Sequence, residues 1–116
     1  MNQFKIDNSL ERRINESDKL MNKHINRIPV IVEISKQNIT DISLPKYKYL
    51  VPADLTIGQF LFIIRKKIKI DQVQALFIFF NNELQVSSDT IGHVYEKNKD
   101  IDGFLYSVIS LENAFG

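Results

Sequence analysis

The chain contains no cysteine and only two histidines, His24 and His93. Without cysteine it has no disulfide framework, no thiolate nucleophile and no cysteine-based metal site. The two histidines stand apart in the sequence, and neither belongs to a spacing that is typical of metal ligands or of histidine-based catalysis. Nor does any pattern of paired carboxylates or of a phosphate-binding loop stand out. The sequence therefore predicts a protein that is not an enzyme and holds no cofactor or metal.

Long apolar runs and a charge excess are also missing. The longest apolar run, residues 75–80, is far shorter than the roughly 20 residues that a membrane-spanning helix needs. Residues 1–20 hold four acidic side chains and no long apolar core, so we expect no secretory signal and a cytoplasmic protein. The net charge of +1, and the lack of an aromatic platform pattern with the basic cluster at 65–69, predict no nucleic-acid partner.

What is present is a clear strand, turn and helix in the middle of the chain. Branched and aromatic residues predict a strand at 47–51, and Pro52 ends it because proline has no N–H to donate. Thr56 and Gln59 have the spacing of a capping box, which predicts the start of a helix over 57–68. Its apolar positions form one stripe that needs a sheet to lie on. The stripe consists of Ile57, Phe60, Leu61, Ile64 and Ile68.

The remaining elements predict a single α+β domain. Helices are expected at 3–7, at 9–23 with Asn8 as the N-cap, and directly after Thr90, which caps a short helix. Strands are expected at 28–34, 76–80, 84–86 and 104–109, with a hairpin turn at Asn81-Asn82. The segments 35–45 and 96–102 are expected to be loops. The strand at 28–34 is apolar on both faces, so we expect one face against the 57–68 helix and the other against the N-terminal helix. Apart from that first helix, the order is that of a ubiquitin-like β-grasp.

Five segments resemble a known family in the same order. They read NRIPVIVE at 26–33, KYLVPADLTIGQF at 48–60, IRKKI at 64–68, ALFIFFNN at 75–82 and FLYSVIS at 104–110. The chain resembles the autophagy ubiquitin-like modifiers, of the microtubule-associated protein light chain three and GABA-receptor-associated protein type, from about residue 9 to residue 116. The resemblance implies an N-terminal helical extension at 1–25, a ubiquitin-like β-grasp at 26–110 and a flexible C-terminal conjugation tail at 111–116.

The resemblance implies first that Gly116 is a site of lipid conjugation. Activating and conjugating enzymes of the autophagy pathway would pass its carboxylate through an adenylate and thioesters to the amine of phosphatidylethanolamine, and a deconjugating cysteine protease would release it. Glycine suits this chemistry because a backbone without Cβ can thread a narrow active-site channel. The protein would be a monomer in solution, and it would mark the autophagosome membrane when lipidated.

The resemblance implies second that cargo receptors bind through aromatic-x-x-aliphatic peptides with acidic flanks, added as a strand to the edge of 47–51. The residues that would line the aromatic pocket are Leu20, Pro29, Ile31, Lys48, Leu50 and Phe104. Those that would line the aliphatic pocket are Tyr49, Val51, Pro52, Leu55, Phe60 and Ile63. The acidic residues of the peptide would meet Arg27, Lys46, Lys48 and Lys67. Periodicity alone predicts Leu50, Phe60 and Phe104 as core. Lys46 and Lys48 equally fit the role of ordinary edge-strand lysines, which discourage aggregation.

The chain departs from the family pattern at three places. His24-Ile25 stand where Tyr-Pro is common, and the loop at 34–46 is one residue longer. Lys67 stands where relatives often have arginine, so a bidentate grip on a carboxylate is not available there.

Two other functions fit the same sequence. One is a ubiquitin-like modifier joined to a protein lysine, which needs a terminal glycine as well. The other is an unconjugated trafficking or cytoskeletal adaptor, for which removal of Gly116 would change nothing in cells. The peptide-binding edge favours the lipid-conjugated modifier over the protein-lysine modifier.

Overall fold

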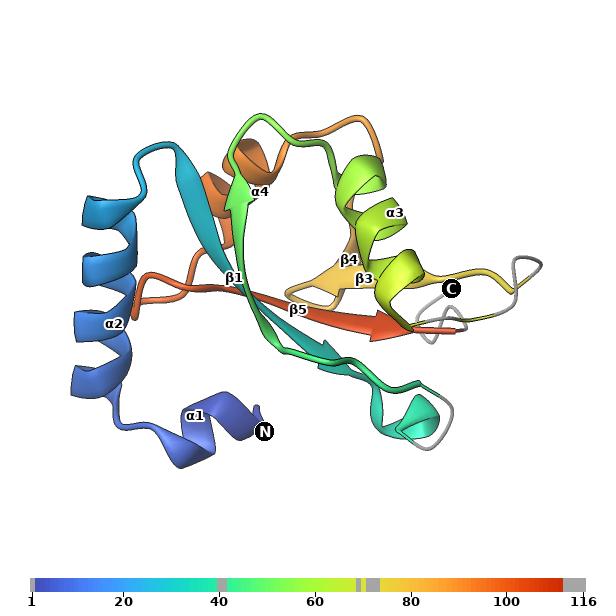
Figure 1. Ribbon diagram of the computed structural model, residues 1–116, viewed down its shortest axis with the longest axis horizontal. Coiled ribbons are helices and arrows are strands. Elements are labelled where there is room, and N and C mark those ends of the chain that lie inside the picture. The colour runs from blue at the N-terminus through green and yellow to red at the C-terminus, as the bar shows by residue number, and fades with distance from the viewer. Residues whose placement is uncertain (1, 40–41, 69, 71–73, 112–116) are drawn as a thin grey trace.

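A five-stranded sheet forms the centre of the protein (Figure 1). The computed structural model describes residues 2–39, 42–68, 70 and 74–111. The strands are β1 (Arg27–Ile34), β2 (Lys48–Pro52), β3 (Phe77–Phe80), β4 (Glu83–Leu84) and β5 (Leu105–Ser110). The helices are α1 (Gln3–Asp7), α2 (Leu10–Lys23), α3 (Ile57–Ile68), α4 (Ile91–Asn98) and the 3-10 turn η1 (Lys36–Asn38). The sheet order is β2-β1-β5-β3-β4, with β1 antiparallel to β2 and parallel to β5, which confirms the expected β-grasp.

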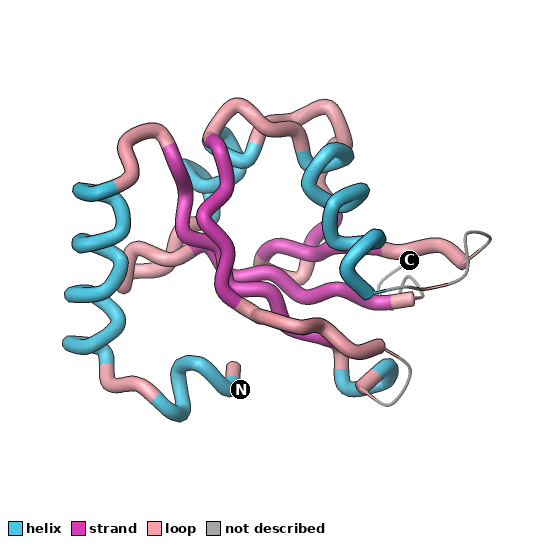
Figure 2. The backbone as a smooth tube through the Cα atoms, viewed as in Figure 1, coloured by secondary structure: helices cyan, strands magenta, loops and turns pink. Residues whose placement is uncertain are grey.

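Helices lie on both sides of the strands, with α2 on one side and α3 on the other (Figure 2). Strand β1 is buried between them, as its two apolar faces predicted. Val30 and Val32 belong to the main core, together with Phe60 of α3. Ile31 points to the opposite face and packs with Phe4 of α1. The alternation of side chains along a strand thus divides β1 between two layers.

Helix α3 begins at the predicted capping box. The Thr56 N–H donates to Gln59 Oε1 at 2.9 Å, and the Gln59 N–H donates back to Thr56 Oγ1 at 3.1 Å. Four residues of the predicted stripe are buried, and Leu61 is half-buried. The helix ends at Ile68, as predicted, and its local signals therefore fixed both its position and its buried face.

The predicted cap of α2 was wrong. Ser9, not Asn8, is the N-cap, because its hydroxyl accepts from the Arg12 N–H at 3.2 Å. Asn8 instead ends α1: its backbone N–H and its side-chain amide both donate to the Phe4 carbonyl, at 3.1 and 3.0 Å. Of these two adjacent cap-forming residues, Asn8 therefore caps the end of α1 and Ser9 caps the start of α2.

The hairpin between β3 and β4 forms at the predicted turn. Asn81 and Asn82 have φ values of 52° and 64°, the left-handed conformation that such a turn needs. The turn pairs Phe80 with Glu83, so β4 is Glu83–Leu84 and not the predicted 84–86.

Several further boundaries differ from the prediction by one residue. Helix α2 begins at Leu10 and not at residue 9, and the strands predicted at 28–34, 47–51 and 76–80 are Arg27–Ile34, Lys48–Pro52 and Phe77–Phe80. Helix α4 runs into the predicted loop at 96–102 and ends at Asn98, where the Lys99 N–H donates to the Tyr95 carbonyl. Strand β5 begins one residue later than predicted. Phe104 belongs to the preceding turn, since its N–H donates to Asp102 and its carbonyl accepts from the Asp100 N–H. The domain division at residues 25 and 110 stays a prediction.

Candidate functional site

Strand β2 is the outermost strand at one end of the sheet and pairs with β1. The Val32 N–H donates to the Tyr47 carbonyl at 2.8 Å. Since hydrogen-bonded pairs alternate along an antiparallel ladder, Tyr49 occupies the next such pair with β1. The backbone N–H and C=O groups of Lys48 and Leu50 therefore face the outer edge, where another strand can be added.

On the α3 face of β2, the predicted aliphatic pocket has a buried base and an exposed rim. Tyr49, Val51 and Phe60 are all buried in the main core, and the rings of Tyr49 and Phe60 meet edge-on at 6.0 Å. Pro52 and Leu55 are half-buried. Ile63 is 39% exposed on α3, so it offers the most accessible apolar surface of this set.

On the opposite face, the predicted aromatic pocket is filled from the N-terminus. Ile31 and Phe104 have no exposed surface and form a small cluster with Phe4, whose ring lies 5.1 Å from that of Phe104. Pro29 is also buried, whereas Leu20, Lys48 and Leu50 are half-buried. No sequence pattern indicated Phe4 as part of this pocket, because its contacts come from strands far along the chain. The accessible part of this pocket lies among Leu20, Lys48 and Leu50.

Three of the predicted basic side chains lie at or beside β2, and all three already have partners. Lys48 forms an ion pair with Glu16 of α2, and its Nζ lies 5.3 Å from the centre of the Phe4 ring. Lys46 Nζ lies 4.8 Å over the Tyr49 ring. The exposed Arg27 donates to the Leu50 carbonyl at 3.4 Å. Glu16, which the sequence did not single out, thus holds the lysine at the mouth of the aromatic pocket.

The remaining predicted basic residue, Lys67, is exposed in the last turn of α3. It therefore sits on the aliphatic side of the strand. Burial raises the pKa of Tyr49, whose hydroxyl donates to the Lys46 carbonyl at 2.9 Å, so this ring stays neutral and hydrogen-bonded beneath the site.

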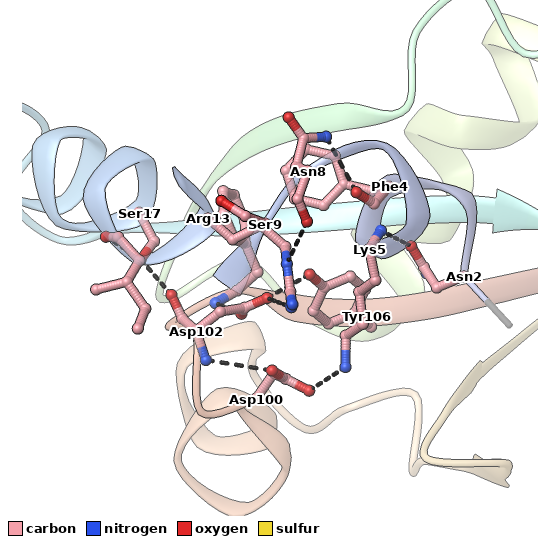
Figure 3. Close-up of polar contacts among 12 residues, drawn as sticks. Asn2, Phe4, Lys5, Asn8, Ser9, Arg13, Ser17, Asp100, Asp102 and Tyr106 are labelled. Atoms are coloured by element: carbon pink, nitrogen blue, oxygen red, sulfur yellow. Dashed lines mark hydrogen bonds and ion pairs between the residues drawn. The ribbon is translucent and has the colours of Figure 1, made fainter. Parts of the chain in front are cut away.

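A buried polar network fastens the N-terminal helices to the turn before β5 (Figure 3). Asp102 is 1% exposed and accepts from Arg13 at 2.8 Å and from the Tyr106 hydroxyl at 2.5 Å. Burial raises the pKa of Tyr106, and its hydrogen bond to Asp102 raises it further. Burial alone lowers the pKa of Arg13, but its hydrogen-bonding and charge interactions with Asp102 and Tyr106 together outweigh that effect and raise the pKa. At the rim, Lys5 pairs with Asp100 at 2.5 Å.

The same turn brings α2 very close to the sheet. Gly103 has a φ of 91°, and a Cβ at this position would lie 2.5 Å from the Ser17 hydroxyl oxygen. The buried Ser17 hydroxyl donates to the Asp102 carbonyl at 2.5 Å. Only glycine meets both the backbone conformation and the close approach.

An apolar hollow of about 300 Å³ lies between α1 and the end of β1. Its lining includes Phe4, Glu33, Ile34, Leu44 and the half-exposed Tyr47. No sequence pattern pointed to it, because it joins short pieces of separate segments. It borders the amino end of β2, beside the aromatic cluster.

Gly116 lies outside the described residues, so its predicted role stays a prediction. Among the residues that the structure does describe, no three histidine, aspartate or glutamate side chains gather as metal ligands. Within the same residues, no helix has the length and apolar character to cross a bilayer.

Comparison with known proteins agrees with this architecture. The sequence model of the family described as "Autophagy protein Atg8 ubiquitin like" matches residues 12–116. The chain belongs to this family. It is 50% identical to Autophagy-related protein 8B of Oryza sativa subsp. indica over 114 residues, which are 97% of this chain and 94% of the relative.

Two solved Atg8 structures are similar to it along nearly their whole length. Trypanosoma brucei ATG8 has a TM-score of 0.87 and 36% identity, covering 95% of this chain and 94% of that one. Plasmodium falciparum Atg8, solved in complex with a Plasmodium falciparum Atg3 peptide, has a TM-score of 0.85 and 31% identity, covering 97% and 98%. The fold is therefore ubiquitin-like, and the protein is an autophagy ubiquitin-like modifier of the Atg8 family, which is a family of modifiers rather than enzymes.

Proposed function

We propose that this modifier is joined through Gly116 to phosphatidylethanolamine on autophagosomal membranes, and that it recruits receptors there through aromatic-x-x-aliphatic peptides. The observation that supports peptide capture most directly is the outer edge of β2, with an apolar cluster on each face. Side chains three apart on an added strand point to opposite faces, because the strand alternates with a period of two. An aromatic anchor and an aliphatic anchor at this spacing fit the two clusters on the two sides of β2.

The peptide strand would bond to the outward backbone groups of Lys48 and Leu50. Its aromatic side chain would enter beside Leu20 and Leu50, and its aliphatic side chain would reach Leu55 and Ile63. Acidic residues next to the anchors would meet the basic side chains Arg27, Lys46, Lys48 and Lys67. Because Lys48 is held by Glu16, an acidic peptide residue competes for a lysine that is already paired.

Family membership supports conjugation, since the match to the family runs through residue 116. The Plasmodium relative was solved with an Atg3 peptide, which makes a conjugating-enzyme partner a reasonable proposal for this chain. The further partners are an activating enzyme and a deconjugating cysteine protease. The protein would be cytoplasmic until lipidation places it on the autophagosome.

The peptide site is tested by Ile63→Lys with Phe62→Lys as its matched control. Both residues are exposed apolar side chains at neighbouring positions of α3, at 39% and 58%. Titration with a synthetic acidic Trp-x-x-Leu peptide in a calorimeter should show at least tenfold weaker binding for Ile63→Lys and near wild-type binding for Phe62→Lys. Equal affinities for both variants would place the peptide elsewhere.

The conjugation site is tested by intact mass of the membrane-associated protein from its own cells, with fragmentation of the C-terminal peptide. We expect a phosphatidylethanolamine adduct on Gly116. Gly116→Ala should abolish the adduct and leave peptide binding intact. An isopeptide bond between Gly116 and a lysine would instead support the hypothesis of a modifier of proteins. An unmodified Gly116 while autophagy is induced would support the hypothesis of an unconjugated adaptor.

A further inference from the structure

The buried side chain of Asn38 ties η1 to the end of β5. Asn38 is 5% exposed, and its Oδ1 accepts three hydrogen bonds from the part of the chain that the structure describes. The donors are the Ser35 hydroxyl at 2.9 Å, the Ser110 hydroxyl at 3.0 Å and the Leu111 backbone N–H at 3.0 Å. Leu111 directly follows β5, so this one oxygen holds the point where the strand ends.

The Asn38 side chain continues the hydrogen-bond ladder between β1 and β5 beyond the end of β1. The Ser35 N–H donates to the Ile109 carbonyl at 2.9 Å, which extends the parallel ladder of β1 and β5 by one bond. In a parallel ladder the next bond would run from the Leu111 N–H to the Ser35 carbonyl. That carbonyl instead accepts the Asn38 N–H at 3.0 Å, because the chain turns into η1. The carboxamide oxygen of Asn38 takes its place and keeps Leu111 in the ladder.

We propose that Asn38 is a positioning residue for conjugation: by holding Leu111, it sets the point from which the C-terminal tail departs. The role rests on the proposed conjugation through Gly116. Gly116 lies five positions after Leu111, and five fully extended steps of the chain span at most about 18 Å. Asn38 therefore limits where the terminal carboxylate can reach while the rest of the modifier docks on its activating enzyme.

Loss of this bond would free Leu111 before the enzyme binds. Ordering the backbone of one more residue in the enzyme's channel then lowers apparent affinity by about fivefold to thirtyfold, the factor that corresponds to roughly 1–2 kcal/mol. The reacting atoms of Gly116 stay the same. The KM of the modifier for its activating enzyme should therefore rise while kcat stays near the wild-type value.

The test measures thioester formation on the activating enzyme from the same cells, with ATP and the full-length modifier at varied concentration. Asn38→Ala should raise KM about fivefold or more without lowering kcat. Asn38→Asp, which keeps an oxygen at the same place, should restore most of the wild-type KM. Ser35→Ala is the matched control, because it removes another donor to the same oxygen and leaves the Leu111 bond intact, and its KM should stay near wild type.

Amide exchange measured by NMR follows the bond itself. The Leu111 N–H should exchange at least ten times faster in Asn38→Ala than in the wild type or in Ser35→Ala. Two results would overturn the positioning role alone. One is unchanged amide exchange at Leu111 in Asn38→Ala. The other is an unchanged KM in Asn38→Ala while the wild-type modifier still forms the thioester with its activating enzyme. A wild-type chain that the activating enzyme never charges would overturn the proposed conjugation, and the positioning role with it.

Discussion

The two faces of β1 are covered in different ways. The α3 face carries the main core, in which Val30, Val32 and Phe60 pack with many other apolar side chains. The N-terminal face carries a cluster of three buried residues, Phe4, Ile31 and Phe104, beside the charged network around Asp102. One face is held by burial of apolar area, and the other by a few rings together with charged hydrogen bonds.

This difference predicts unequal stability on the two sides of β2. Apolar burial contributes roughly in proportion to area, so the α3 face should carry most of the free energy of folding. The five-residue helix α1 buries mainly Phe4, so it should open locally at a lower free energy than the whole domain. The proposed aliphatic pocket thus rests on the stable side, and the aromatic pocket on the side that opens more readily.

The largest effect is expected from Phe60→Ala. Its ring is 2% exposed and lies at the centre of the main core. Truncation leaves a cavity and should lower the free energy of unfolding by about 3–5 kcal/mol. Urea denaturation followed by circular dichroism measures this change. A loss below about 1 kcal/mol would show that the α3 face is not the main source of stability.

A smaller effect is expected from Arg13→Met. The substitution keeps much of the side-chain length but leaves the buried Asp102 without its cation. Hydrogen bonds to charged groups contribute about 1.5–3 kcal/mol, so a loss in this range is expected in the same denaturation experiment. Arg12→Met is the control, because Arg12 is exposed on the same helix. Equal losses in both variants would rule out a special role for the buried pair.

Phe4→Ala makes the same change as Phe60→Ala on the other face. We expect a loss of only about 1–2 kcal/mol, since α1 can separate while the sheet and α3 stay packed. Hydrogen exchange should accelerate in α1 and stay slow in β1. A loss as large as that of Phe60→Ala, with fast exchange throughout, would mean that the two faces unfold as one unit.

The smallest effect is a dependence on pH from the pair of Lys5 and Asp100. Burial alone raises the pKa of Asp100, but the hydrogen bonds from Lys5 and from the Asp102 backbone, together with the nearby positive charges of Lys5 and Arg13, outweigh it and hold the pKa below the ordinary value of 3.8. The pair therefore stabilises the fold above about pH 4, and this contribution is lost as the pH falls through the lowered pKa. A partly exposed pair is worth less than about 1 kcal/mol.

The check is to compare wild type and Lys5→Met in thermal unfolding at pH 6 and at successively lower values below pH 4. The difference between the two proteins should shrink as the solution becomes more acidic. A difference that stays constant down to pH 2 would assign the effect of Lys5 to packing over the Tyr106 ring, 4.6 Å from its Nζ, and not to charge.

Short-range signals in the sequence predicted most of the fold. The Thr56–Gln59 box, the Asn81-Asn82 turn and the Thr90 cap all act over four residues or fewer, and all three appear in the structure. The wrong cap of α2 came where two local signals compete. Asn8 and Ser9 are both good caps, and the choice between them depends on how α1 ends.

For the candidate site, the resemblance to the family predicted residues on both faces of β2. It did not predict which other side chains pack over those residues. Burial of Ile31 and Phe104 against Phe4, and the ion pair of Lys48 with Glu16, depend on where the N-terminal helices lie. Neither contact has a sequence pattern, because its partners come from separate elements.

The sequence by itself determined the elements, the β-grasp order and the family, because caps, turns and strand patterns are set by neighbours along the chain. Only the tertiary structure decided which side chains close the N-terminal face and how β5 ends. The hydrogen bond from Leu111 to Asn38 joins residues 73 positions apart. Such contacts exist only after the sheet has brought distant segments together, and no local pattern specifies them.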